Sequence, residues 1–173
     1  MSEDGEGFRA FVRSSLPILS RAAYALTFDI HRAQDLVQET HIRVARHWDR
    51  LAKPPSDPLP YARKILYRLW QDSLRWHSRH PERLGEVPDL AGDSTQEAVT
   101  EALVLREALA RLPQLQRAVL VLRYLDGQTE AETAEILGCT VATVQSQARR
   151  GLSSLRGHYG LPVAEQQARR SSS

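Results

Sequence analysis

Hydrophobic residues in the first fifty positions recur every three or four residues, which is the period of an amphipathic helix. Over residues 8–27 this spacing predicts one helix, which Pro17 should bend or interrupt because proline lacks a backbone N–H. The same spacing predicts a second helix over about residues 30–50, and Asp29 can cap its first turn. Each helix therefore has one apolar face to bury.

A proline-rich segment follows, with four prolines in LAKPPSDPLP at positions 51–60. Prolines this dense are incompatible with a helix and predict a stiff loop. Helical spacing returns over about residues 61–79 and is lost again over residues 80–97, where Pro, Gly, Asp and Ser predict a linker. Fully extended, a linker of this length reaches roughly 55–60 Å, so the two domains it joins could lie far apart.

The C-terminal half is also predicted to be helical, first over about residues 98–111 and 114–125 and then in a helical motif described below. No stretch of any length has the strict alternation of a strand. We therefore predict an all-α fold with two small helical domains joined by a flexible linker. Its parts are a first domain over residues 8–79, the linker over 80–97, a second domain over 98–157 and a disordered tail over 158–173.

The strongest local signal is a helix-turn-helix pattern in TEAETAEILGCTVATVQSQAR, residues 129–149. The pattern opens with a capping box and needs a small residue, a turn glycine and an apolar anchor at offsets of four and six. Ala134, Gly138 and Val144 meet that need, and Thr140 can cap the second helix. A plain helical hairpin with a solvated polar face is the alternative interpretation.

The last predicted helix, residues 141–157, carries three arginines and no acidic residue. Its opposite face is apolar and should meet the core through Val141, Val144, Ala148, Leu152 and Leu155. A polar and basic outer face of this kind suits the phosphate backbone of duplex DNA.

The helix after the proline-rich loop has a basic stripe formed by Lys64, Arg68, Arg75 and Arg79, with Trp76 at its border. Cations beside an exposed aromatic ring suit single-stranded nucleic acid, whose phosphates and unstacked bases are both accessible. A basic face that is only solvated is the alternative. On the second predicted helix, Asp35 and Glu39 are four residues apart and should repel each other slightly, which a basic partner would relieve.

Composition narrows the function classes. The chain has 173 residues, of which 42% are hydrophobic and 25% charged, as in one or two small globular domains. One cysteine excludes an internal disulfide framework, and we find no metal-ligand spacing, catalytic constellation or nucleotide-binding motif. We therefore expect no enzyme activity, metal or cofactor. An acidic N-terminus and the lack of an apolar run of about 18 residues predict a cytoplasmic protein without membrane insertion.

The order of the motifs carries a resemblance. The segments are HRAQDLVQETHIRVARHW, the proline-rich loop, YARKILYRLWQDSLRWHSR and LPQLQRAVLVLRYLDGQTEAETAEILGCTVATVQSQARRGLSSLR. Over roughly residues 8–157 they resemble a bacterial sigma-70-type factor of the short extracytoplasmic-function (ECF, group IV) class. The resemblance implies a subunit that binds the β′ clamp helices of core RNA polymerase and directs promoter-specific initiation at −10 and −35 elements. An anti-sigma factor is a further partner that it suggests.

The resemblance also implies three sets of binding residues. Core polymerase would bind Asp35, Gln38, Glu39, Arg43 and Arg46. The −10 element, where the strands part, would bind the loop over residues 52–60 and the residues Tyr61, Lys64, Arg68, Gln71, Arg75 and Trp76. The −35 duplex would bind Thr140, Thr143, Ser146, Gln147, Arg149 and Arg150.

Two other functions stay open at this point. A stand-alone helix-turn-helix regulator would bind its operator tightly without polymerase, but would leave the basic stripe and the acidic helix without a task. A helical adaptor or anti-sigma-type binder would not depend on Arg149 and Arg150. The chain also departs from the sigma pattern, because Gln145 and Gln147 stand where basic residues are common. We therefore expect weak intrinsic −35 binding.

Overall fold

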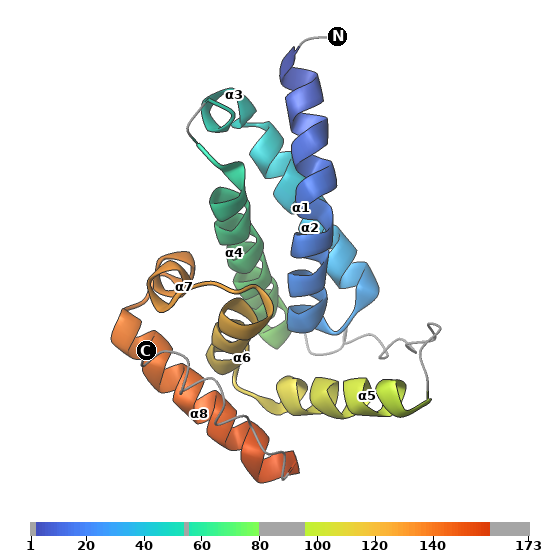
Figure 1. Ribbon diagram of the computed structural model, residues 1–173, viewed down its shortest axis with the longest axis vertical. Coiled ribbons are helices and arrows are strands. Elements are labelled where there is room, and N and C mark those ends of the chain that lie inside the picture. The colour runs from blue at the N-terminus through green and yellow to red at the C-terminus, as the bar shows by residue number, and fades with distance from the viewer. Residues whose placement is uncertain (1–2, 54–55, 80–95, 160–173) are drawn as a thin grey trace, which may run out of the picture.

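The computed structural model describes residues 3–53, 56–79 and 96–159, and every regular element in those ranges is helical. Figure 1 shows three helices packed along one another in the N-terminal half, with α5 and α8 of the C-terminal half below them. The elements are α1 (Glu3–Thr27), α2 (Ile30–Ala45), α3 (Trp48–Leu51), α4 (Pro58–Arg79), α5 (Gln96–Arg111), α6 (Gln114–Leu120), η2 (Val121–Leu125), α7 (Glu130–Leu137) and α8 (Val141–Tyr159).

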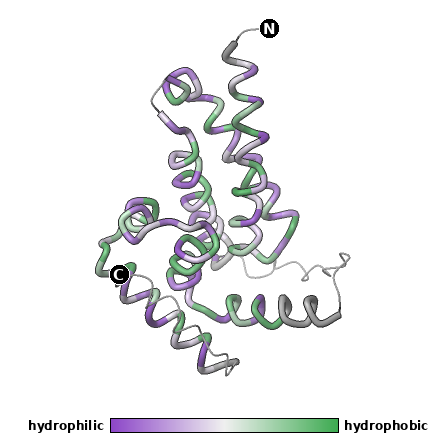
Figure 2. Tube along the Cα trace, in the orientation of Figure 1, coloured by the Kyte–Doolittle hydropathy of each residue, from purple (hydrophilic) through white to green (hydrophobic). Residues whose placement is uncertain are grey.

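The N-terminal half is a bundle of α1, α2 and α4 around a large core. Tyr67 and Trp70 of α4 are almost fully buried in it, together with Leu19 and Leu26 of α1. The predicted cap of α2 is confirmed, because the Asp29 carboxylate accepts hydrogen bonds from the backbone N–H groups of residues 31 and 32. Figure 2 shows hydrophobic and hydrophilic residues alternating along the helices, as amphipathic helices require.

Prolines affect the helices less than predicted. The interruption expected at Pro17 is wrong, because α1 runs through this residue, which is exposed on the helix surface. The expected exclusion of helix from residues 51–60 is also wrong, since α4 begins at Pro58. The first turn of a helix has no internal partner for its N–H groups and therefore tolerates proline.

Two other predicted helices differ at their ends. The helix expected over residues 30–50 stops at Ala45, and the short α3 follows after a turn in which the N–H of His47 bonds to the Val44 carbonyl at 3.0 Å. The helix expected over residues 114–125 changes after Leu120 into the π-helix η2. The Asp126 N–H closes that π-turn by donating to the Val121 carbonyl at 2.9 Å.

The two halves of the chain pack against each other. Ala118, Val121 and Leu122 from α6 and η2 belong to the same buried cluster as the core of the N-terminal bundle. The expectation that the halves could lie far apart therefore does not describe this conformation. Most of the predicted linker (residues 80–95) and of the tail (160–173) lies outside the described residues. Within the described part of the chain, no helix is both long and apolar enough to cross a bilayer.

Candidate protein-docking and nucleic-acid interfaces

The solvent-facing side of α2 carries the residues predicted to bind polymerase. Asp35 and Gln38 are exposed, and so is Arg46 at the C-cap of the helix. Arg43 Nε donates to Glu39 Oε1 at 2.7 Å, one turn along the same helix. The repulsion predicted between Asp35 and Glu39 is therefore relieved within the helix, and a basic partner is not needed for that purpose.

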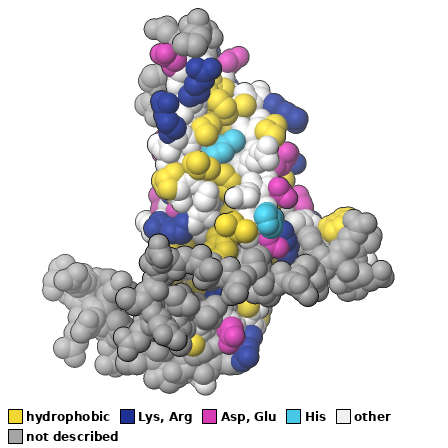
Figure 3. All heavy atoms as spheres, turned by 90° about the vertical axis from the view of Figure 1, so that its right-hand side faces the viewer, with side chains coloured by type: hydrophobic (Ala, Val, Ile, Leu, Met, Phe, Trp, Pro, Cys, Tyr) yellow, Lys and Arg dark blue, Asp and Glu magenta, His cyan; other side chains and the backbone are white. Residues whose placement is uncertain are grey.

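An apolar groove runs beside this polar face, between α1 and α2. It has a volume of about 500 Å³, and its lining includes Phe8, Val12, Leu16, Val37, Gln38 and Ile42. Leu16 and Ile42 are 46% and 42% exposed, so both contribute apolar surface to the groove. Figure 3 shows hydrophobic side chains running along this side of the molecule with charged ones at the edges. Its apolar lining makes the groove a candidate docking site.

Sequence reasoning missed this groove, although one signal was available. Ile42 follows His41 and lies outside the buried stripe of α2, which contains Val37, His41 and Val44. An aliphatic residue on the polar side of an amphipathic helix indicates a second apolar contact. At the groove's base, His41 Nε2 lies 2.9 Å from the hydroxyl of Ser15, and burial lowers the pKa of this imidazole.

The face of α4 carries the residues predicted to bind the −10 element. Arg68 and Arg75 are exposed, Trp76 is 44% exposed, and Tyr61 and Gln71 are half-buried. Trp70 is 1% exposed and belongs to the core, so only Trp76 of these two rings could stack on a base. Lys64 is not a free cation here, since its Nζ is paired with Glu135 Oε1 of α7.

The helix-turn-helix has the local geometry that the sequence predicts. Thr129 and Glu132 form a reciprocal capping box at the start of α7. Gly138 ends α7 at φ +67°, a conformation that side chains disfavour. Val144 is fully buried between the helices. Val141, predicted to face the core, is instead 39% exposed, because it occupies the first position of α8 ahead of the packed turn.

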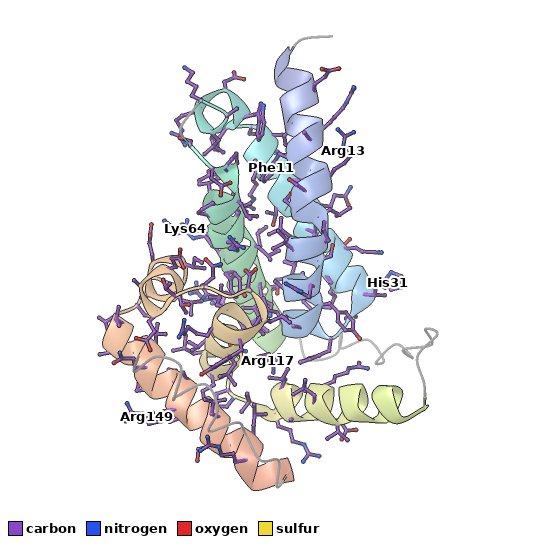
Figure 4. The ribbon with its side chains drawn as sticks, in the orientation of Figure 1. Phe11, Arg13, His31, Lys64, Arg117 and Arg149 are labelled. Carbon is purple, nitrogen blue, oxygen red and sulfur yellow. The ribbon has the colours of Figure 1, made fainter. Side chains whose placement is uncertain are left out.

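The outer face of α8 is polar and partly hollowed. Arg149 and Arg150 are exposed there, while Ser146 and Gln147 are half-buried. Figure 4 shows Arg149 on α8. A polar hollow of about 640 Å³ extends from α8 to α6 and is lined by Gln116, Ser146, Arg149, Arg150, Ser153 and Ser154. The two predicted threonines have local roles as well, since Thr140 Oγ1 accepts the backbone N–H of Thr143 at 3.1 Å and caps α8.

Comparison with known proteins identifies the two halves. The family model for Sigma-70 region 2 matches residues 11–80, and that for Sigma-70, region 4 matches residues 102–155. RNA polymerase sigma-E factor of Streptomyces avermitilis is 32% identical over 152 residues, which cover 86% of this chain and 83% of that protein. ECF RNA polymerase sigma factor EcfG of Rhodopseudomonas palustris is also 32% identical, over 87% of this chain and 83% of that protein.

One further relative and two solved structures are also similar to this chain. The protein named "Probable RNA polymerase sigma factor RfaY" of Xanthomonas campestris is 33% identical over 146 residues, and the chain spans 36% of its length. The fold resembles the sigma factor RpoE in its co-crystal structure with the anti-sigma factor NepR from Bartonella quintana, with a TM-score of 0.75 over 90% of this chain and 98% of that chain at 22% identity. CnrH in complex with the cytosolic domain of CnrY gives a TM-score of 0.65 at 21% identity, over 87% of this chain and 85% of that one. This chain belongs to the sigma-70 family of RNA polymerase sigma factors, within its ECF class.

Proposed function

We propose that this chain performs the initiation function of its family through three surfaces, on α2, α4 and α8. As an ECF sigma factor it binds core RNA polymerase and directs it to promoters, and it is a recognition subunit rather than an enzyme. The observation that carries the proposal is the pairing of a region 2 bundle and a region 4 helix-turn-helix in one chain, each with an exposed polar face.

Core polymerase binds the polar face of α2 together with the adjacent apolar groove. The polar contacts come from Asp35, Gln38, Glu39, Arg43 and Arg46. Exposure of Asp35 and Gln38 supports this assignment, and Gln38 also lines the groove. The groove provides apolar area for affinity, while the charges at its edge favour one orientation of a docked helix.

The two DNA elements bind in different halves of the chain. For the −10 element the residues are Tyr61, Lys64, Arg68, Gln71, Arg75 and Trp76, supported by the exposed guanidinium groups and indole of α4. For the −35 element they are Thr140, Thr143, Ser146, Gln147, Arg149 and Arg150, supported by the acid-free surface of α8 and its hollow. Cations and hydroxyls in these arrangements suit phosphates and base edges.

The location of the chain and one further partner follow from this assignment. Because its partners are polymerase and promoter DNA, we place the protein in the cytoplasm. An anti-sigma factor is a further partner, supported by the similarity of the fold to the sigma factor RpoE, whose structure is a complex with the anti-sigma factor NepR.

Run-off transcription tests the proposed function. Purified bacterial core polymerase is combined with this chain on promoter templates selected from a randomised library, and transcripts are sequenced from their 5′ ends. Initiation that depends on the chain and starts downstream of a shared pair of elements is expected. Tight site-specific DNA binding by the chain alone, without any transcription or association with core, would contradict the proposal and favour the stand-alone regulator.

A further inference from the structure

An aromatic cluster at one end of the N-terminal bundle anchors the short helix α3. Trp48 opens this helix and is only 8% exposed. Its ring centre lies 5.2 Å from that of Phe8 and 5.5 Å from that of Phe11, both on α1. The α1 backbone also passes close by, since a side-chain carbon added at Gly7 would lie 3.5 Å from the indole. A buried ring therefore fixes α3 to α1, although α3 has only four residues.

His47 directly precedes this anchor, and its backbone is held on both sides. Its N–H donates to the Val44 carbonyl at 3.0 Å, and its carbonyl accepts from the N–H groups of Arg50 and Leu51, both at 3.1 Å. The imidazole is exposed and makes no capping hydrogen bond to α3. The side chain of His47 therefore projects from a fixed backbone without being needed to build it.

The imidazole of His47 contacts Tyr61, which comes first along α4 among the residues that we assign to the −10 element. The two ring centres are 6.2 Å apart and the ring planes meet at 80°. This is the edge-to-face arrangement that aromatic pairs favour. Figure 1 shows α3 at the end of the bundle where α4 begins. A series of ring contacts thus runs from α1 through α3 to the start of α4.

The place of Tyr61 in α4 explains why this contact matters. Large helical side chains point back towards the helix N-terminus and lie over the preceding turn. Because α4 begins at Pro58, only one turn precedes Tyr61. Tyr61 is half-buried, so part of its ring faces solvent. The direction of that exposed part depends on a neighbour from another element, and His47 is such a neighbour.

We infer that His47 is a positioning residue for promoter recognition, which fixes the orientation in which Tyr61 meets the −10 strand and does not touch DNA itself. The inference rests on the proposed function, because that function assigns Tyr61 to the −10 element. The contact needs a flat ring at position 47 and neither a charge nor a proton donor. Phenylalanine should therefore serve there as well as histidine.

Variants at position 47 test the inference in the complex with core polymerase. The probe is a fluorescein-labelled single strand with the −10 sequence shared by the promoters selected in the run-off experiment, and anisotropy gives its Kd. His47→Ala is expected to raise the Kd about threefold to tenfold, because the fraction of chains with Tyr61 in the binding orientation falls. His47→Phe is expected to bind as the unaltered chain does.

His31→Ala is the matched control for these variants. It makes the same substitution at an exposed histidine of α2 and is expected to leave the Kd unchanged. Figure 4 shows His31 on the other side of the bundle from Lys64 of α4. Unchanged binding by His47→Ala, or failure of His47→Phe to restore binding, would overturn the inference.

A double-mutant cycle separates positioning from direct contact with DNA. Tyr61→Leu removes the phenol ring but keeps an apolar side chain at this half-buried position. In that background His47→Ala is expected to have no further effect on the Kd, because the ring that it positions is gone. Losses that add in the double variant would show that His47 contacts the strand itself and would overturn the inference.

Nuclear magnetic resonance of the free chain distinguishes this inference from the proposed function. The unaltered chain is expected to show Overhauser contacts between the imidazole protons of His47 and the ring protons of Tyr61. Their absence would overturn the positioning of Tyr61 by His47, whether or not DNA binds. Failure of the unaltered complex to bind the −10 strand would instead count against the proposed function.

Discussion

The two halves of this sigma factor are stabilised in different ways. The N-terminal bundle buries large side chains, including Tyr67, Trp70 and Leu66, in one extended core. The helix-turn-helix has a separate small core whose buried members are Val119, Ala134 and Val144. It relies on a capping box, a turn glycine and contact with the bundle. A small reader domain can therefore be held in shape by local geometry and by its neighbour rather than by a large core of its own.

The largest predicted effects come from truncating one buried side chain in each of the two cores, which tests whether the cores are separate. Trp70→Ala should destabilise the whole protein by about 3–5 kcal/mol, because a fully buried indole is lost from the core that both halves share. Val144→Ala should cost about 1.5–3 kcal/mol and act mainly on α7 and α8. Denaturant unfolding gives the free energies, and hydrogen exchange shows which helices lose protection. Equal loss of protection everywhere in Val144→Ala would mean that the two cores are not separate.

The next prediction concerns charge on the C-terminal half. Because Gln145 and Gln147 are uncharged where the sigma pattern commonly has basic residues, the full chain should bind duplex DNA weakly and with a shallow salt dependence. Changing both to arginine should steepen the log–log slope by about two, since each new phosphate contact contributes about 0.9. Gln34→Arg on exposed α2 is the control for added charge. A slope as steep in the unaltered protein as in the double variant would refute the prediction.

A smaller effect is expected at the turn of the helix-turn-helix. Gly138→Ala forces a side chain into φ +67° and should cost about 1–2 kcal/mol. Gly157→Ala, in α8 at an open position with no contact within 4 Å, should instead stabilise by up to about 1 kcal/mol. Thermal unfolding of both variants measures the contrast. Similar changes at the two glycines would show that the turn geometry is not needed.

The smallest predicted effect is a pH dependence in the N-terminal half. Burial lowers the pKa of His41 from its ordinary value of 6.5, so below that pH the unfolded chain takes up a proton that the folded chain resists. The contribution of neutral His41 to the free energy of unfolding is therefore complete above pH 6.5 and is lost as the pH falls. His41→Gln should flatten the fall in unfolding free energy between about pH 7 and pH 5. An identical pH profile for the variant would contradict this.

Much of the local structure could be predicted because its causes are local. The cap at Asp29, the box at Thr129 and the turn at Gly138 each depend on residues within a few positions of one another. The continuation of α1 through Pro17 was missed, because whether a helix accommodates a proline depends on which side of that helix faces water. The π-helix η2 was missed because its sequence, VLRYL, also suits an ordinary helix.

The packing of the two halves could not be predicted from local patterns. Arg63 and Asp126 form a buried ion pair between the halves and are 63 positions apart, and neither lies in a segment whose sequence indicates the other. For the same reason Lys64 was identified as a phosphate contact without any sign of its pairing with Glu135. The roles given to α2, α4 and α8 came from the order of the motifs, and they stay predictions.

The central claim is that core polymerase binds the polar face of α2. The most direct test is whether a variant with reversed charge on this face still co-elutes with purified core polymerase. Asp35→Lys with Glu39→Lys should abolish co-elution, because it puts cations on the docking surface and also removes the partner of Arg43. The matched control is Asp49→Lys with Glu107→Lys, which changes net charge equally at exposed sites outside that face and should co-elute normally. Retained binding by the α2 variant would contradict the assignment of polymerase to this surface.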